Sequence, residues 1–220
     1  DRNIVSINKN LKGWKKVMKH MRKALSLLLV LAMVVCFAVP AMAASPEGAT
    51  VTVYITRDMF TKGGIDSNGN QIPQAYIGGV PTSYVKKVEV KPSEITASEL
   101  AQYRNSYSNP DTTSTTVNVL DAIACALTKS NLTYTGGWDT YNTPNGGYIS
   151  SVSGFSGESA SARVRVNGTW YMKYSGSGWN IAFNRGNGFE VPAQYGNNYS
   201  VTNGMIIVFD FSAYELYYAA

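Results

Sequence analysis

Histidine and cysteine are nearly absent from this chain. Its 220 residues include a single histidine, His20, and two cysteines, Cys36 and Cys125. Because His20 and Cys36 both lie in the first 43 residues, the rest of the chain holds one thiol and no imidazole. Ser-His-Asp and Cys-His catalysis are therefore excluded there, as are histidine-rich zinc sites and an intramolecular disulfide.

Positive charge is also scarce once the first 43 residues are set aside. The whole chain carries 19 Lys and Arg against 14 Asp and Glu, a net charge of +5. Residues 44–220 hold 11 of the basic residues and 13 of the acidic ones, so their net charge is −2. Because nucleic-acid binding needs many Lys and Arg side chains to neutralise phosphates, we expect no nucleic-acid partner.

The basic residues near the beginning follow the pattern of an export signal. Residues 1–17 contain no methionine, and we interpret them as an upstream or non-native segment. From Met18, a basic stretch leads into an apolar run over 24–39, and Ala41-Met-Ala43 supplies the small residues that a signal peptidase accepts. The pattern predicts a signal peptide over 18–43, cleavage near Ala43/Ala44, and a secreted chain without a stable membrane span after cleavage.

Two alternatives for this segment stay open. Residues 24–43 are long enough to span a bilayer, so the signal can instead be retained as an anchor. Pro40 and the Ala-x-Ala ending argue against that anchor. Cys36 would be the acceptor of a lipid in a lipoprotein, but it follows two valines rather than a small residue.

Residues 44–220 are expected to form a single domain that is rich in strands. Alternating apolar and polar residues predict strands at 50–56, 84–90, 132–135, 148–152, 162–166, 170–174 and 205–211. Asn167-Gly168 predicts a type I′ turn between two of them. N-cap residues followed by an acid three positions later predict a short helix after Thr96 and the main helix after Asn118. The expected fold is α+β, with a twisted, mostly antiparallel sheet packed on one main helix.

Five segments in the second half of the chain resemble a known family. They are, in order, Val119-Leu-Asp-Ala-Ile, Gly147-Tyr-Ile-Ser-Ser-Val, Val166-Asn-Gly-Thr-Trp, residues 176–184 and residues 201–210. This order is similar to that of the transcobalamin-like C-terminal domain, also called bacterial domain of unknown function 4430, over residues 116–212. The resemblance implies a β-grasp-like fold and makes cobalamin, or another corrinoid-like ring, a candidate ligand.

Tyrosine and tryptophan indicate where a ligand would bind. Both present a large apolar face with a polar group at its edge, which suits binding surfaces as well as cores. The predicted ligand-binding residues are Trp138, Tyr171, Tyr174, Trp179 and Asn180. They lie near Gly-Ser stretches, which we expect to be flexible loops. Alternation places Trp170, Met172 and Tyr174 on one face of their strand, and we expect Trp170 and Met172 in the core. Trp179 is either structural or ligand-facing.

These features together predict a secreted or cell-surface binding module that is not an enzyme. The expected ligand is a corrinoid-like or other ring-shaped molecule, and the alternative is a glycan or a surface protein bound in adhesion. A glycoside hydrolase is a less favoured alternative, since no pair among five carboxylates has a diagnostic spacing. These five are Asp121, Asp139, Glu158, Glu190 and Asp210.

Residues 66–70, Asp-Ser-Asn-Gly-Asn, resemble the beginning of a calcium-binding loop. The glycine at position six and the acid at position twelve of such a loop are missing, and Ile77 stands at the latter position. We therefore expect a turn at 66–70 and no metal site. Cys125 is expected on the helix side opposite the apolar stripe, as a structural thiol.

Overall fold

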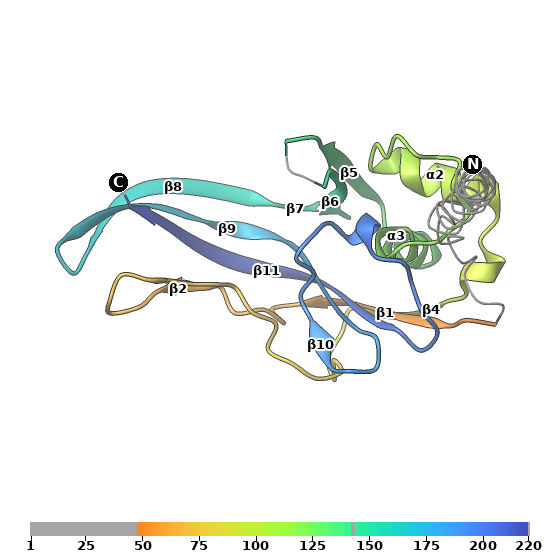
Figure 1. The fold of residues 1–220 in the computed structure, drawn as a ribbon, viewed down its shortest axis with the longest axis horizontal. Helices are drawn as coiled ribbons and strands as arrows, with labels where there is room; N and C mark the ends of the chain where they lie inside the picture. Colours follow the sequence, from red (N-terminus) through yellow and green to blue (C-terminus); the bar gives the residue numbers. More distant parts are fainter. Residues whose placement is uncertain (1–47, 142–143, 220) are drawn as a thin grey trace, which may run out of the picture. The chain divides into compact units, whose positions relative to one another are not determined.

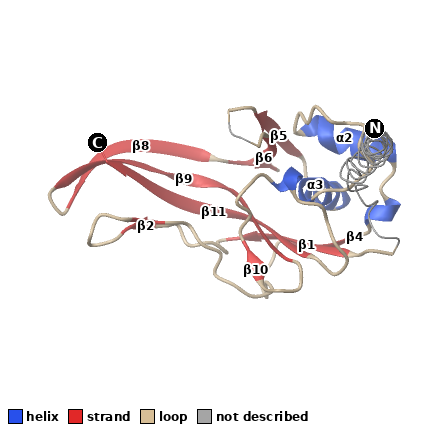
Figure 2. Cartoon of the chain, viewed as in Figure 1, coloured by secondary structure: helices blue, strands red, loops and turns tan. Residues whose placement is uncertain are grey.

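An α+β fold is formed by residues 48–141 and 144–219, which the computed structural model describes (Figures 1 and 2). These residues belong to one unit, Ala44–Ala220. The predicted export signal lies outside the described residues. Within them, no helix is both long enough and apolar enough to cross a membrane.

The main sheet has six strands in the order β10-β9-β11-β1-β4, with β8 paired to another part of β9. These strands are β1 (Val51–Arg57), β4 (Lys86–Val90), β8 (Glu158–Val166), β9 (Thr169–Asn184), β10 (Phe189–Glu190) and β11 (Ile206–Ala219). The β1–β11 pair is parallel and the other four pairs are antiparallel. A mostly antiparallel sheet is thereby confirmed.

Two small sheets accompany the main one. The hairpin that follows β1 consists of β2 (Gly64–Ile65) and β3 (Gln71–Ile72). The other small sheet consists of β5 (Tyr134–Asp139), β6 (Gly146–Val152) and β7 (Phe155–Ser156). Single turns of 3-10 helix lie at η1 (Pro92–Glu94) and η2 (Gly196–Asn198).

Both predicted helices are present and begin at capping boxes. They are α2 (Ala97–Ser106) and α3 (Val119–Lys129). At α2, the Thr96 hydroxyl accepts from the Glu99 N–H, and the Glu99 carboxylate accepts from the Thr96 N–H. Asn118 and Asp121 make the same reciprocal pair of bonds at α3, at 2.8 and 3.1 Å. These side chains satisfy N–H groups that have no partner within the helix.

The core lies between α3 and one face of the sheet. Leu120, Ile123 and Leu127 of α3 are buried in the same cluster as Ile207 and Phe209 of β11. α3 also contacts α2, β1 and β4, which explains why its whole first two turns are buried rather than one stripe.

Cys125 is buried on the α2 side of α3, where its thiol interacts with Tyr103. Burial raises the pKa of this thiol, because desolvation disfavours the thiolate. A protonated thiol under a helix fits the structural role expected of Cys125.

β9 is much longer than the strand predicted at 170–174. The stretch Gly176-Ser-Gly178, expected to be a flexible loop, lies inside β9, with β11 on one side and the beginning of β8 on the other. A Cβ atom on Gly176 would lie 1.8 Å from the Glu158 carbonyl oxygen, so glycine allows the close approach of β8. The loop prediction was therefore wrong.

The predicted Asn167-Gly168 turn joins β8 to β9. Both residues have positive φ, 50° and 87°, as a type I′ turn requires. The turn closes an arm of the sheet, defined as β8, residues 169–177 of β9 and residues 212–219 of β11, which continues past the part of β11 paired with β1. Figure 2 shows the helices packed at the other end of the sheet, so they cover neither face of the arm.

Candidate functional site

The β2–β3 hairpin follows the outer edge of the arm along β11 (Figure 1). The Lys62 carbonyl accepts from the Glu215 N–H at 2.6 Å, and the Gln71 side chain accepts from the Tyr217 N–H at 2.7 Å. These bonds satisfy backbone groups that an edge strand would otherwise expose to another chain. The hairpin therefore protects this edge of the arm.

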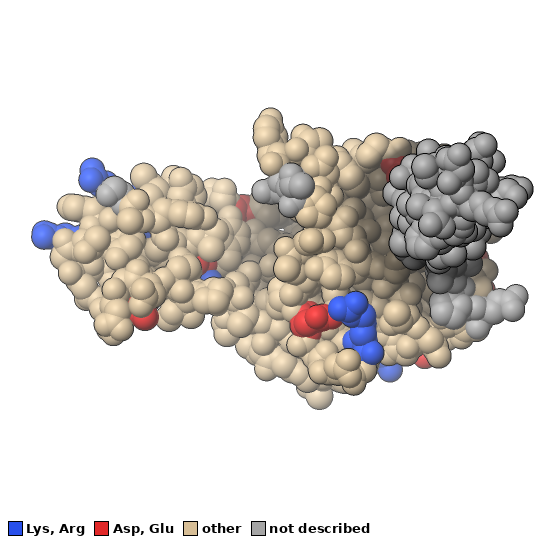
Figure 3. All heavy atoms as spheres, viewed as in Figure 1, with Lys and Arg blue, Asp and Glu red and all other residues tan. Residues whose placement is uncertain are grey.

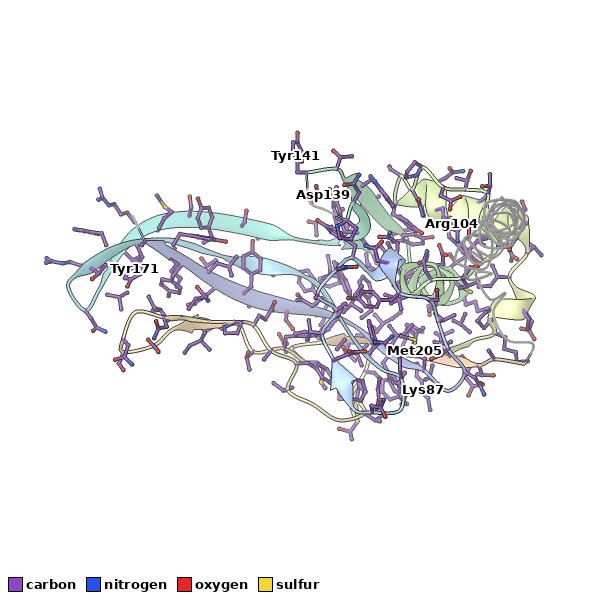
Figure 4. The ribbon with its side chains drawn as sticks, viewed as in Figure 1. Lys87, Arg104, Asp139, Tyr141, Tyr171 and Met205 are labelled. Atoms are coloured by element: carbon purple, nitrogen blue, oxygen red, sulfur yellow. The ribbon has the colours of Figure 1, made fainter. Side chains whose placement is uncertain are left out.

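The same hairpin covers one face of the arm. Its Ser67 carbonyl accepts from the Asn167 side chain at 2.9 Å, which links the tip of the hairpin to the β8–β9 turn. Tyr171 is 9% exposed, and its hydroxyl lies 3.5 Å from the Gly69 carbonyl oxygen. Figure 4 shows Tyr171 in the arm, far from the core residue Met205. Tyr171, predicted to contact a ligand, thus belongs to the packing between hairpin and arm.

Glu215 connects the hairpin to this covered face. Its carboxylate contacts the ammonium groups of Lys62 and Lys173 at 3.0 and 3.1 Å, and accepts from the Tyr217 hydroxyl at 2.9 Å. Hydrogen bonding from Lys62 is the main cause that lowers the pKa of Glu215 from 4.5 to about 2. The ionised carboxylate therefore holds two lysines from separate segments.

The pKa of Glu215 predicts how stability changes with pH. Because the folded-state pKa lies below the ordinary value, the stabilisation is present above pH 4.5 and is lost as the pH falls toward 2. We expect Glu215→Gln to lower the unfolding free energy at pH 7 but little at pH 2, as measured by urea denaturation across this range. Glu89→Gln, which removes an exposed acid of β4, is the control. An equal loss at both pH values would contradict the assignment.

The opposite face of the arm is open and carries a group of apolar side chains, here called the aromatic face. It consists of Trp170, Met172 and Tyr174 of β9 with Leu216 and Tyr218 of β11. In the register, Leu216 lies opposite Tyr174 and Tyr218 opposite Met172, so these side chains share one face. Trp170, Tyr174 and Tyr218 are 46%, 41% and 57% exposed. The Tyr174 and Tyr218 rings meet edge to face at 5.7 Å.

The expectation of a buried Trp170 was wrong. Alternation correctly placed Trp170, Met172 and Tyr174 on one face, but the hairpin covers the other face, which carries Tyr171. Trp170 is exposed. Met172 is only partly buried and belongs to neither core cluster, so the expectation of Met172 in the core was wrong as well. The pattern within one strand cannot indicate which of its two faces a distant hairpin will cover.

The remaining predicted site residues lie away from the aromatic face. The Trp179 ring stacks on Phe209 at 4.5 Å, and its indole N–H donates to a main-chain carbonyl at 3.0 Å. Trp138, on β5, packs partly buried against the main core. The Asn180 side chain donates to a carbonyl of its own strand at 3.2 Å. Of the five predicted residues, the structure places Tyr174 alone on the aromatic face.

Two arginines border the aromatic face. Arg163 and Arg165 of β8 lie opposite Met172 and Trp170 in the register. Their guanidinium carbons are 5.1 and 6.0 Å from the centre of the Trp170 ring, within range of a cation–π interaction. Figure 3 shows Lys and Arg atoms at the far end of the arm. The Arg-Val-Arg-Val alternation of 163–166 is the signal in the sequence that places two arginines on one face of a strand.

The carboxylates considered for glycoside chemistry do not pair with one another, and most of them bond to other side chains. Asp121 pairs with Arg104 at 2.9 Å, and Glu190 with Arg185 at 2.5 Å. The others have these positions: Asp139 accepts from the Tyr195 hydroxyl, Asp210 accepts from Thr56 and Ser212, and Glu158 is exposed at the beginning of β8. Asp121 and Asp210 have no exposed surface, so a substrate in solution does not reach them.

Residues 66–70 form the expected turn. The Asp66 carboxylate accepts from the N–H groups of Asn68 and Asn70, both at 2.8 Å, which closes the β2–β3 hairpin. These bonds lower the pKa of Asp66, with the Asn70 N–H as the main cause. Over the ranges 48–141 and 144–219, no three His, Cys, Asp or Glu side chains gather as a metal site would need.

Two of the surface pockets formed by the described residues lie elsewhere on the fold. One, of about 630 Å³, is lined by Tyr76 and Val80 before β4 and by Phe189 and Val191 at β10. Burial raises the pKa of Tyr76 to about 12, and its hydroxyl donates to a carbonyl of the same loop. The other, of about 470 Å³, lies between α2 and the beginning of β5. Neither pocket is lined by a predicted site residue.

The aromatic face and its two arginines are thus the part of the described surface with the clearest means of holding a ligand. Flat rings lie in a row, the row is open to solvent, and positive charge borders it. Comparison of the chain with family models, with curated proteins and with solved structures gave no match.

Proposed function

We propose that the protein is a secreted or cell-surface binding module, that it is not an enzyme, and that it holds its ligand on the aromatic face. The exposure of Trp170, Tyr174 and Tyr218 side by side carries this proposal. A soluble protein rarely leaves contiguous apolar side chains in water unless they serve binding. The absence of histidine beyond residue 20 supports a role without catalysis.

A carbohydrate chain is the ligand that this face favours. Trp170, Met172 and Tyr174 project from alternate positions of one strand, whose rise of about 3.3 Å per residue separates the outer two by about 13 Å. That row is open along its length, whereas a small ligand is usually enclosed by a pocket. A pyranose ring has an apolar C–H side that packs against an aromatic ring, so successive sugars can stack along the row.

A corrinoid-like ring remains the second candidate, and with it the β-grasp assignment that the family resemblance implies. The flat side chains of Trp170 and Tyr174 favour a planar ligand in this case too. A protein ligand in adhesion is the third. Titration with cobalamin separates the second candidate from the other two, because a corrinoid stacked on Trp170 would quench its fluorescence.

We expect Trp170→Ala and Tyr174→Ala each to weaken polysaccharide binding by at least tenfold. Burying an aromatic side chain is worth about 1.5–3 kcal/mol, and tenfold in affinity is about 1.4 kcal/mol. Binding is measured by affinity electrophoresis of the purified protein in gels containing soluble cellulose, xylan or pectin derivatives. Tyr141→Ala is the matched control, since Tyr141 is 98% exposed and lies away from the arm (Figure 4).

Two results would overturn this proposal. One is binding that both arm variants retain in full, because the ligand would then lie elsewhere. The other is the absence of binding to every polysaccharide combined with quenching by cobalamin, which would favour the corrinoid. Both variants are expected to keep the melting temperature of the unmodified protein, since their side chains are only half buried.

A further inference from the structure

The positive charges on the two faces of the arm have different surroundings. On the covered face, Lys62 and Lys173 share the Glu215 carboxylate at 3.0 and 3.1 Å. On the aromatic face, Arg163 and Arg165 contact the Trp170 ring, and no ion pair of the described residues includes either of them. The aromatic face therefore carries two positive charges that no carboxylate in the described part of the chain balances.

The placement of these two guanidinium groups leaves them able to bind an anion. A guanidinium that contacts a ring still has N–H groups along its edge for hydrogen bonding. The Arg165 Nε donates to the Gly168 carbonyl at 3.0 Å, and within the described part of the chain no hydrogen bond involves its two terminal nitrogens. Such edges match a carboxylate with two parallel hydrogen bonds. An anionic group on a ligand stacked against Trp170 would lie within their reach.

We propose that the aromatic face selects acidic polysaccharides, in which a uronic-acid unit carries an apolar ring side and a carboxylate on the same sugar. This inference rests on the function proposed above. The sugar ring stacks on Trp170 or Tyr174, and Arg163 and Arg165 bind its carboxylate. An acidic polypeptide carries carboxylates for the two arginines but has no sugar rings to stack on the aromatic side chains. A nucleic acid needs many more cations than two to release its counterions.

The test compares two forms of one polymer. Polygalacturonate and its methyl ester have the same backbone, but the carboxylates of the ester are neutral. We expect the purified protein to bind polygalacturonate at least tenfold more tightly at low salt, with an advantage that shrinks as salt screens the exposed arginines. Affinity is measured by isothermal titration calorimetry or affinity electrophoresis, and poly-L-glutamate serves as the polyanion without sugar rings.

The double variant Arg163→Gln/Arg165→Gln is expected to lose this preference while it keeps its affinity for the methyl ester. Lys86→Gln/Lys87→Gln is the matched control. It removes the same charge from β4, away from the arm (Figure 4), and it is expected to keep the preference. A preference that the lysine control loses equally would overturn the inference, because net charge alone would then be responsible.

The remaining outcomes separate the inference from the proposed function. Equal affinity for polygalacturonate and its ester, lost in Trp170→Ala, overturns the selection of acidic sugars and upholds a glycan-binding face. Tighter binding to poly-L-glutamate than to polygalacturonate overturns the inference in favour of an acidic polypeptide. If neither form of the polymer nor any neutral polysaccharide binds, both the inference and the glycan proposal fail.

Discussion

Replacement of Arg104 by leucine is expected to lower the free energy of unfolding by about 3–5 kcal/mol, because it leaves a buried carboxylate without its countercharge. Arg104 and Asp121 lie 2.9 Å apart with side-chain exposures of 2% and 0%. Asp121 also accepts from the Tyr107 hydroxyl at 2.7 Å and from the Asn118 N–H at 3.1 Å. Arg104 donates further to carbonyls of the loop over 111–116. One ion pair thereby joins α2, α3 and the loop between them.

Urea denaturation at pH 7 measures the effect of this substitution. Lys91→Gln is the control, since it breaks an exposed ion pair with Glu94 and is expected to change the free energy of unfolding far less than Arg104→Leu. The double variant Arg104→Leu/Asp121→Asn should be more stable than Arg104→Leu alone, because asparagine can still accept from the helix N-cap without a charge. A loss below 1 kcal/mol for Arg104→Leu would show that the pair is not buried as described.

Phe209→Ala should have an effect of similar size, a loss of about 3–5 kcal/mol, because it empties the centre of the core. Phe209 is 1% exposed and stacks on Trp179 at 4.5 Å. Urea denaturation measures the loss of stability. The emission maximum of Trp179 is expected to shift to longer wavelength, because water reaches the indole once Phe209 is removed. A Trp179→Phe variant identifies the part of the emission that comes from Trp179.

Phe155→Ala is the matched control for that core substitution. Phe155 lies near the same aromatic group but is 44% exposed, so its removal should cost much less. If the Phe209→Ala protein kept both the stability and the Trp179 emission of the unmodified chain, Trp179 would not be part of the core, and its prediction as a ligand-facing residue would be revived.

The features that the sequence predicted correctly are local ones. Thr96 with Glu99 and Asn118 with Asp121 mark the two helix starts, because a capping box needs only residues three positions apart. The Asn167-Gly168 turn is equally local, since it depends on the backbone freedom of two adjacent residues. Alternation then identified most strands, although their ends were placed several residues short in β8, β9 and β11.

What the sequence did not predict depends on segments far apart in the chain. The glycines of 176–178 favour a loop by composition, but strands on both sides hold them extended. Whether Trp170 or Tyr171 would be covered was decided by the hairpin at 64–72, about a hundred residues earlier. Arg163 and Arg165 belong to a candidate binding site only because the pairing of β8 with β9 places them beside Trp170. Binding surfaces of this kind are formed by tertiary contacts, and the pattern of residues within one strand does not predict such contacts.

The parallel pairing of β1 with β11 has a consequence for when the chain can fold. Thr56 and Asp210, which share a hydrogen bond across this pair, are 154 residues apart. Contacts at such separation make folding slow, because bringing the two ends of a long intervening chain together costs entropy before the contact can stabilise anything. β1 therefore cannot pair with β11 until ribosomes have made nearly the whole described sequence. A chain that is led through a membrane pore from its N-terminus, as the proposed export signal implies, would enter it as an unfolded polymer and complete its core on the far side.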